Sequence, residues 1–383
     1  MHLPVEMITN VSLKQRGLLE KYNYMALRRD KCVFIIICLS FLYRTRRITS
    51  VFWELAWPVK TRGSSLRSGR KKYLVAKAKV TMQQHYEQWV ATTAFVSPLY
   101  ILTIVLGSLG NGMVIYSYAT DQTIHRTFHF LITNLAIADL IMCLLFTPIL
   151  FIYRVYAKAE LISYTPVCEI SLFLSMVSIS MMYFLFPLLA YHRKDAMLRP
   201  QQPRLNLAQT RLVVFFFWFL STFAGGLMIL MARREFGSGD PTPKLYRCLL
   251  INQNLDRYAK IFLGYSATLY GLSIAVTAVL YLHIFRTLGT NIEGVNGSAD
   301  ERHVTKLCFW VAIVYTAFWT PFLLVQLGGV FGNYTELHFN LHGCSSGIGV
   351  IGSAVNPLLY AIMHPYYRAK LRDLFNRLTC RSG

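Results

Sequence analysis

Seven long runs of apolar residues dominate the chain after its first ninety residues. At 1.5 Å of rise per residue, each run is long enough to cross a hydrocarbon core of about 30 Å as a tilted helix. The runs are 92–119, 128–155, 166–192, 210–232, 258–288, 304–331 and 341–363. Only 15% of the residues are charged, too few for an ordinary soluble surface. The pattern predicts an all-α membrane protein, a seven-transmembrane helix bundle, and it lacks the alternation of a membrane β-barrel.

The formal net charge of +21 is unevenly distributed, which argues against nucleic-acid binding. An excess of 13 positive charges falls in residues 1–81, and an excess of 8 falls in residues 82–383. The eight cysteines form no CxxC pair and have no histidine at zinc spacing, so we expect no metal site. We predict no nucleic-acid partner and no cofactor.

The short loops give the predicted orientation. Fourteen lysine and arginine residues lie at one set of helix ends and in the carboxyl-terminal tail, against eight in the opposite loops. Because cytoplasmic loops hold the excess of positive charge, the set of fourteen is predicted to be cytoplasmic. With seven spans, the amino terminus is then extracellular and the carboxyl terminus cytoplasmic, as in a multi-pass protein of the plasma membrane.

We divide the chain into three parts. Residues 1–90 form a basic segment that we expect to be disordered and extracellular, 91–363 the transmembrane domain, and 364–383 an amphipathic membrane-surface helix with a cytoplasmic tail. The eleven apolar residues Cys32–Leu42 are short for a span and fall in the range of a signal sequence. An alternative is that residues 1–81 are an upstream extension of the gene, with Met82 as the natural start.

One carboxylate, Asp139, lies in the middle of the second run. A charge at this depth is unfavourable in hydrocarbon, so Asp139 is expected to face the interior of the bundle and to meet polar groups there. Asn111 in the first run and Asn356 in the last are the expected partners.

Several short motifs occur in a fixed order along the seven runs. They are Gly110-Asn111, Asn134-Leu-Ala-Ile-Ala-Asp139, Cys168 at the start of the third run, Trp218 in the fourth, Trp319-Thr-Pro321 in the sixth and Asn356-Pro357-Leu-Leu-Tyr360 in the seventh. Each motif alone is weak, but together in this order they are specific. Over about residues 90–380 the chain resembles the rhodopsin-like (class A) G-protein-coupled receptors.

The resemblance implies a switch at the cytoplasmic ends of the helices. Arg193, 25 residues after Cys168, takes the place of the arginine in the family's DRY motif, here His192-Arg193-Lys194. Histidine replaces the usual carboxylate, so Glu301 at the inner end of the sixth helix is expected to restrain Arg193 alone in the closed state. This expectation implies raised or pH-sensitive basal signalling. Tyr281 and Tyr360 are expected to hydrogen-bond around Arg193 when the cytoplasmic cleft opens.

The resemblance also implies an activation core that connects the ligand site to this switch. Pro321 removes a backbone hydrogen bond and kinks the sixth helix, and Trp319 would sense the ligand above that hinge. Pro357 is expected to form a similar proline kink in the seventh helix. The activation core that the resemblance implies consists of Asn111, Asp139, Trp319, Pro321, Asn356 and Pro357.

The expected ligand site excludes two ligand classes on chemical grounds. Ser175 stands where amine receptors of the family carry an aspartate, and Val350 stands where opsins carry the lysine that binds retinal. The predicted lining is apolar with a few uncharged polar groups, which suits a neutral or lipid-like ligand or the apolar end of a peptide. The predicted ligand-binding residues are Ser175, Met176, Ile179, Tyr265, Phe322, Gln326, His342 and Ser346. Basic residues in the outer loops could meet an acidic group, or could simply be solvated.

Several expected modifications and surfaces complete the prediction. The resemblance implies an extracellular disulfide between Cys168 and Cys248. Sequons place glycosylation at Asn10 and Asn333, and Cys380 is a candidate for palmitoylation. The stretch after Tyr360 has aromatic residues and leucines on one face and basic residues on the other, so membrane lipids are expected partners.

The favoured function is a receptor that binds an extracellular ligand, a peptide ahead of a lipid or a small acidic metabolite, and activates a heterotrimeric G protein. The rivals are a receptor-like protein that does not signal, a transporter or channel, and an intramembrane enzyme. Asp139 is the one charge in mid-membrane, too little for an ion relay. No HExxH or GxSxG motif and no paired membrane aspartates appear, so no enzymatic activity is predicted.

Overall fold

The computed structural model describes residues 90–124, 126–156, 166–199, 204–236, 257–290, 299–331 and 336–378. Within them, seven helices are long and apolar enough to cross a membrane, and no strand is present. The spans are Val90–Thr120, Thr127–Ile152, Glu169–Leu198, Leu207–Leu230, Leu263–Thr287, Glu301–Gly328 and Asn340–Met363. The predicted all-α fold with seven spans is confirmed. The predicted basic segment 1–90 lies outside the described residues except for Val90.

The first two spans each contain a short π-helical segment. Residues 90–102 are helical and lead through η1 (Thr103–Gly107) into α4 (Ser108–Thr120). After the 3-10 turn η2 (Gln122–Ile124), α5 (Thr127–Leu140) leads through η3 (Ile141–Phe146) into α6 (Thr147–Tyr156). The two π segments contact each other. A side chain at Gly107 would overlap Cys143, so the glycine permits this close approach.

Five longer helices complete the described transmembrane region. They are α7 (Pro166–Leu198), α8 (Leu207–Phe236), α10 (Arg257–Thr290), α11 (Ala299–Phe331) and α12 (Glu336–Met363). The α7 helix packs against α5, α8, α10 and α11, and is therefore central. It continues six residues past the predicted end of its apolar run, as far as Leu198. Beyond the apolar run, Asp195 accepts a hydrogen bond of 2.6 Å from the backbone N–H of Arg204, which ties the end of α7 to the segment before α8.

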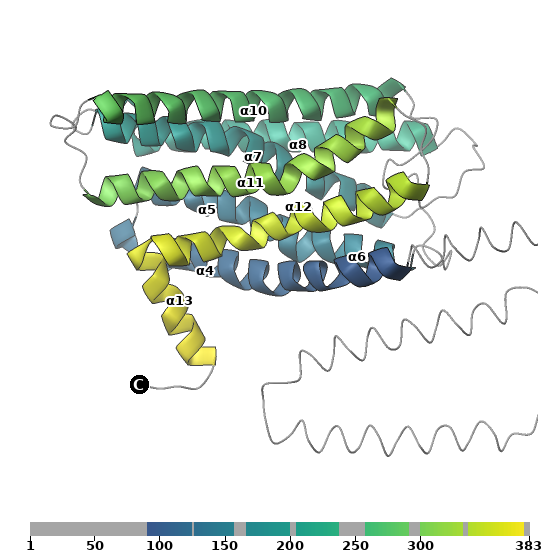
Figure 1. The fold of residues 1–383 in the computed structure, drawn as a ribbon, viewed down its shortest axis with the longest axis horizontal. Coiled ribbons are helices and arrows are strands. Elements are labelled where there is room, and N and C mark those ends of the chain that lie inside the picture. Colours follow the sequence, from purple (N-terminus) through teal and green to yellow (C-terminus); the bar gives the residue numbers. More distant parts are fainter. Residues whose placement is uncertain are drawn as a thin grey trace, which may run out of the picture. The chain divides into compact units, whose positions relative to one another are not determined.

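The last helix, α13 (Pro365–Leu378), turns away from α12 at the end of the bundle that is at the left of Figure 1. Arg368 donates to the carbonyl oxygen of Ala361 over 3.2 Å, so it satisfies a carbonyl at the end of α12. We call the α13 end of the bundle the inner end, because its lysine and arginine residues predict that it is cytoplasmic. The opposite end is called the outer end.

Large apolar side chains cover much of the outside of the bundle. Leu212 and Phe215 on α8 are each 70% exposed, and Ile362 on α12 is 65% exposed. Such a surface is unfavourable in water and suits contact with lipid tails. Polar side chains meet inside instead. The Trp218 indole N–H on α8 donates to the side-chain oxygen of Asn134 on α5 over 3.0 Å.

Candidate functional site

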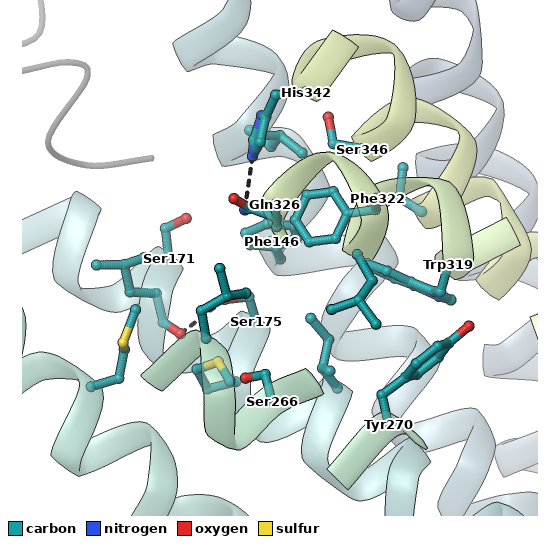
Figure 2. Close-up of a pocket in the computed structure, with 18 of the residues that line it drawn as sticks. Phe146, Ser171, Ser175, Ser266, Tyr270, Trp319, Phe322, Gln326, His342 and Ser346 are labelled. Atoms are coloured by element: carbon teal, nitrogen blue, oxygen red, sulfur yellow. Dashed lines mark hydrogen bonds between the residues drawn. The ribbon is translucent and has the colours of Figure 1, made fainter. Parts of the chain in front are cut away.

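An outer cavity of about 130 Å³ lies between the helices, on the outer side of Trp319 (Figure 2). Seven of the eight predicted ligand-binding residues line it, and α7, α11 and α12 supply them. These seven are Ser175, Met176, Ile179, Phe322, Gln326, His342 and Ser346. The predicted set was drawn from four helices, and its members on three of them lie on this one cavity. Their role in ligand binding stays a prediction.

Tyr265 is the exception and requires a correction. It is not among the described residues that line the cavity, and its side chain is 40% exposed. The next residue of α10, Ser266, lines the cavity instead. A step of one residue rotates a side chain by about 100° around a helix, so an error of one position in the register moves it off the cavity.

The sequence interpretation missed several lining residues. Phe146 and Leu150 come from the second span, and Ser266 and Tyr270 come from α10. Each of these two pairs is separated by four residues, the spacing that places side chains on one helix face. The spacing of four residues could have identified these pairs in the sequence. It could do so only once the face of each helix that points toward the cavity was known.

The outer cavity has polar groups but no acidic, lysine or arginine side chain among its described lining residues. The Nε2 atoms of Gln326 and His342 lie 3.1 Å apart in a hydrogen bond (Figure 2), and the hydroxyls of Tyr100 and Ser346 lie 3.0 Å apart. No lysine or carboxylate is among the described lining residues, and Val350 is one of them. A Schiff base with retinal therefore cannot form at this position.

Trp319 lies at the inner side of the outer cavity and connects it to the bundle core. Its ring packs edge-on against Phe322 at a centroid distance of 5.7 Å, and it lies 6.4 Å from the ring of Tyr315. A β-carbon at Gly349 would come within 3.1 Å of the indole, so α12 approaches Trp319 closely. The buried indole N–H has no hydrogen-bond partner among the described residues. A ligand in the cavity would thus contact Trp319, whose ring packs against Phe322 and Tyr315 within α11.

Asp139 is fully buried, as predicted, but only one of its two expected partners contacts it. Asn356 donates to a carboxylate oxygen of Asp139 over 2.7 Å. Asn111 instead donates to the backbone carbonyl oxygens of Gly107 and Ser353, both over 3.0 Å. Carbonyls on two helices compete for its amide, so Asn111 joins the first span to the last and is not the partner of Asp139.

Gly110, next to Asn111, lies directly against Pro357. A β-carbon at position 110 would be 2.6 Å from the Cβ of Pro357, closer than atoms can approach. The glycine and the proline therefore fit together where the first and last spans cross. Pro357 and Pro321 are each inside a continuous helix, at the positions where hinges were expected.

Arg193 joins α7 to α11 at the inner end of the bundle. Its guanidinium donates to Glu301 over 2.9 Å and to the Nδ1 atom of His192 over 2.7 Å, and it lies 4.9 Å from the ring of Phe128. Arg193 is 2% exposed, whereas the Glu301 side chain is 43% exposed. The expectation that Glu301 alone restrains Arg193 is therefore corrected: His192 also does so, because a neutral imidazole can still accept a hydrogen bond.

The two tyrosines expected near Arg193 are buried but are not its hydrogen-bond partners among the described residues. Tyr281 packs edge-on against Phe309 at 5.3 Å. Tyr360 packs against Tyr367 at 5.8 Å, and its hydroxyl has no partner in the described part of the chain. In this arrangement the Arg193–Glu301 ion pair joins α7 to α11.

The α13 helix is fastened to the bundle by contacts that the sequence interpretation missed. Tyr367 is fully buried and shares a hydrogen bond of 2.9 Å with Nδ1 of His129, and Tyr366 donates to Asp121 over 2.9 Å. Lys370 lies 3.7 Å from the same carboxylate. Hydrogen bonds from Thr123, and then from Tyr366, lower the pKa of Asp121 from 3.8 to about 2. The pKa of Tyr366 is raised to about 12 by burial and by Asp121.

Replacing Asp121 with asparagine is expected to loosen α13, because it removes the charge that Tyr366 and Lys370 share. Amide hydrogen exchange in residues 365–378 should become faster. The matched control is Asp373→Asn, an exposed carboxylate on α13 itself. Because the pKa of Asp121 is lowered, its contribution is complete above about pH 4 and is lost as the pH falls through about 2. Unchanged exchange in Asp121→Asn would show that other contacts, such as those of Tyr367 and Arg368, hold the helix without Asp121.

The side chains of the five predicted modification residues lie outside the described part of the chain. Cys168 lies in α7, but its side chain, like Cys248, Asn10, Asn333 and Cys380, is outside the described residues. The expected disulfide, glycosylation and palmitoylation thus remain predictions. In the described part of the chain, no group of three histidine, cysteine or acidic residues could hold a metal ion.

Comparison with known proteins agrees with this geometry. A family model described as 7 transmembrane receptor (rhodopsin family) matches residues 110–360. Opsin-3 of Manduca sexta is 26% identical over 294 residues, covering 72% of this chain and 75% of the opsin. Neuropeptide FF receptor 2 of Rattus norvegicus is 22% identical over 323 residues, covering 77% and 76%.

A solved structure is similar to the fold. The crystal structure of squid rhodopsin matches with a TM-score of 0.58 at 18% identity, over 76% of this chain and 88% of the rhodopsin. At this level of identity the likeness concerns the fold alone.

Proposed function

The chain belongs to the rhodopsin family of seven-transmembrane receptors and is a G-protein-coupled receptor, and we propose that it binds an extracellular ligand and activates a heterotrimeric G protein. Activation separates the inner end of α11 from α7 and rearranges α12, which opens a cleft for the G protein. In this proposal the receptor lies in the plasma membrane with its carboxyl terminus and α13 on the cytoplasmic side.

The observation that carries the proposal is the ion pair between Arg193 on α7 and Glu301 on α11. It closes the inner end at the point where a G protein would enter, and it uses a nearly buried guanidinium with a half-exposed carboxylate. Such a pair is strong enough to favour the closed state and weak enough to be broken by a ligand. Ring contacts lead from the outer cavity toward Arg193. Trp319 packs against Tyr315, and Tyr315 packs against Phe186 on α7.

A peptide is the favoured ligand. The outer cavity of about 130 Å³ is smaller than the roughly 300–1,000 Å³ of sites for drug-sized molecules, so one or two side chains of a larger ligand fit it best. The N–H of Trp319 offers a hydrogen bond to a peptide carbonyl. Basic residues predicted at the outer end of the bundle, such as Arg234 and Lys244, would meet the remainder of the peptide. One similar protein is named as a neuropeptide receptor, which agrees with this choice.

Two alternatives follow from other features. A lipid or small acidic metabolite would use the same apolar cavity together with the basic residues that the sequence predicts on the outer side. A receptor-like protein that does not signal is the alternative raised by His192, which replaces the usual carboxylate before Arg193. The similar opsins do not make this chain a retinal protein, because Val350 lines the cavity where a lysine would be needed.

Replacing Glu301 with alanine is the test of the proposal. Loss of a half-exposed ion pair worth about 1 kcal/mol should shift the closed-to-open equilibrium about fivefold. Basal guanine-nucleotide exchange on purified G proteins should rise accordingly, in nanodiscs without added ligand. The control is Arg302→Ala, the exposed neighbour on α11, which should leave exchange unchanged. No rise with any of the main G-protein classes would favour the receptor-like protein that does not signal.

A further inference from the structure

Several hydroxyl groups around the outer cavity have no hydrogen to offer a ligand. The hydroxyl of Ser175 donates to the carbonyl oxygen of Leu172 over 2.9 Å, and the hydroxyl of Tyr270 donates to the carbonyl oxygen of Thr316 over 3.1 Å. The hydroxyl of Ser266 has no partner among the described residues, but solvent cannot reach it. A ligand therefore cannot receive a hydrogen bond from any of these three groups.

The side-chain oxygen of Gln326 on α11 is an accessible acceptor. The amide nitrogen of Gln326 can only donate, so it gives a hydrogen to Nε2 of His342 over 3.1 Å (Figure 2). The oxygen of the same amide has no hydrogen bond in the described part of the chain, and it is not one of the unpaired polar atoms that solvent cannot reach. Because Gln326 lines the outer cavity, a ligand there can reach this oxygen.

His342 on α12 holds this acceptor in place. Its ring packs against the ring of Phe322 at a centroid distance of 5.3 Å, and its Nε2 atom accepts the hydrogen of Gln326. The amide of Gln326 cannot exchange its oxygen and nitrogen by rotation without breaking this bond. The cavity therefore presents a fixed acceptor, which a ligand can use without first ordering the side chain.

Two hydroxyls on α7 are accessible as well. Ser171 and Tyr183 line the outer cavity, and their hydroxyl oxygens have no hydrogen bond within the described ranges. Neither oxygen is among the unpaired atoms that solvent cannot reach. A hydroxyl can donate to a carbonyl oxygen. The cavity thus combines an acceptor from α11 with possible donors from α7.

These groups favour an uncharged occupant that both donates and accepts. No aspartate, glutamate, lysine or arginine is among the described lining residues, so a carboxylate or an ammonium group would lose its hydration without gaining a counter-ion. A ketone would leave the oxygen of Gln326 without a donor. A single hydroxyl places its donor and its acceptor on one atom, whereas a carboxamide separates them and can contact α7 and α11 together.

We propose that the part of the ligand in the outer cavity carries a primary carboxamide, whose N–H donates to the side-chain oxygen of Gln326 and whose carbonyl oxygen accepts from Ser171 or Tyr183. This inference rests on the proposed function, because it names the chemistry of the ligand at the same site. In a peptide ligand the group is an asparagine or glutamine side chain or an amidated carboxyl terminus. A free carboxyl terminus is disfavoured in the cavity.

Three compounds that differ in one group test the proposal: phenylacetamide, phenylacetate and phenylacetone. Their carbonyl carbon carries NH₂, O⁻ or CH₃, and their ring suits a cavity of about 130 Å³, since one of roughly 150 Å³ holds benzene. Binding to the full-length protein in nanodiscs is measured by saturation-transfer NMR, with empty nanodiscs as background. Phenylacetamide should bind at least about five times more tightly than either analogue. Equal affinity of the amide and the ketone, or no saturable binding of the amide, would overturn the proposal.

Two variants locate the hydrogen bond. Gln326→Leu removes the acceptor, so the amide and the ketone should then bind equally. His342→Phe removes the bond that fixes Gln326 and should reduce the advantage of the amide. The control is Leu324→Ala, a residue that is 62% exposed on the outside of α11 and is not among the described lining residues, and it should keep the full advantage. An advantage that survives Gln326→Leu would overturn the proposal.

The measurement is independent of signalling, because fragment binding requires no G protein. Carboxamide-dependent binding in a protein that never promotes nucleotide exchange would keep this proposal and overturn the proposed function. Nucleotide exchange without carboxamide-dependent binding would do the reverse. Each variant is compared at an equal amount of monodisperse protein, so a loss of folded protein is not read as a loss of binding.

Discussion

Guanine-nucleotide exchange is expected to fall to the level of the G protein alone when Arg193 is replaced with alanine in the Glu301→Ala background. Glu301→Ala frees Arg193 from α11, and the freed guanidinium is then available to the G protein and to Tyr281 and Tyr360. Removal of a buried, hydrogen-bonded charge at an interface costs about 2–5 kcal/mol, so the decrease should be at least about tenfold. Exchange is measured with the receptor in nanodiscs at equal receptor concentration.

A matched variant separates coupling from folding. Arg193→Lys keeps the charge and loses the planar fork, so it should retain part of the exchange that Arg193→Ala loses. Thermal unfolding of Arg193→Ala should change little, because α7 still packs against α5, α8 and α10. If the Glu301→Ala protein exchanged nucleotide equally well with and without Arg193, this arginine would not be the coupling residue.

Gly110→Ala is expected to destabilise the bundle more than any other single methyl addition discussed for this chain. The new β-carbon would lie 2.6 Å from the Cβ of Pro357 and 2.7 Å from its Cγ. Pro357 is a rigid ring inside α12 and cannot rotate away, so the first and last spans must separate. Overpacking of this kind costs about 1–3 kcal/mol. The measurement is the thermal unfolding midpoint in a fixed detergent.

Gly112 gives the matched control, since it lies two residues further along α4. A β-carbon at Gly112 meets no atom within 4 Å. Gly112→Ala should therefore keep or slightly raise the unfolding midpoint, because alanine favours a helix over glycine by up to about 1 kcal/mol. Equal midpoints for the two variants would show that the first and last spans do not pack as closely as Gly110 and Pro357 indicate.

The large features of the fold could be predicted from the sequence because the surrounding hydrocarbon determines them. A polar backbone in hydrocarbon must form helices, so long apolar runs identify the spans almost directly. The same reasoning placed Asp139 inside the bundle, since a carboxylate has no stable position facing lipid. The Arg193–Glu301 contact was reached in a different way, through the ordered motifs and their spacing from Cys168.

The errors concern interactions that depend on helix rotation and on competing partners. Tyr265 was one residue away from the position that faces the cavity, because α10 is apolar on most of its faces and its periodicity does not fix its rotation. Asn111 was predicted to pair with Asp139, but its amide donates to the carbonyls of Gly107 and Ser353 instead. Backbone carbonyls at a helix crossing leave no pattern in the sequence.

Other features required coordinates because they arise between distant segments. The contact of Tyr367 with His129 joins residues that are 238 positions apart, and neither belongs to a recognised motif of the chain. A sequence pattern on one helix cannot show what the other helix places opposite it.

The most direct test of the account is the distance between the inner ends of α4 and α11. Spin labels at positions 120 and 302, both exposed, report this distance by electron paramagnetic resonance. The unliganded protein should show one dominant short distance, and Glu301→Ala should add a population at longer distances that grows further with nucleotide-free G protein. Identical distance distributions in both proteins, with and without G protein, would contradict a switch in which Arg193 and Glu301 hold α11 closed.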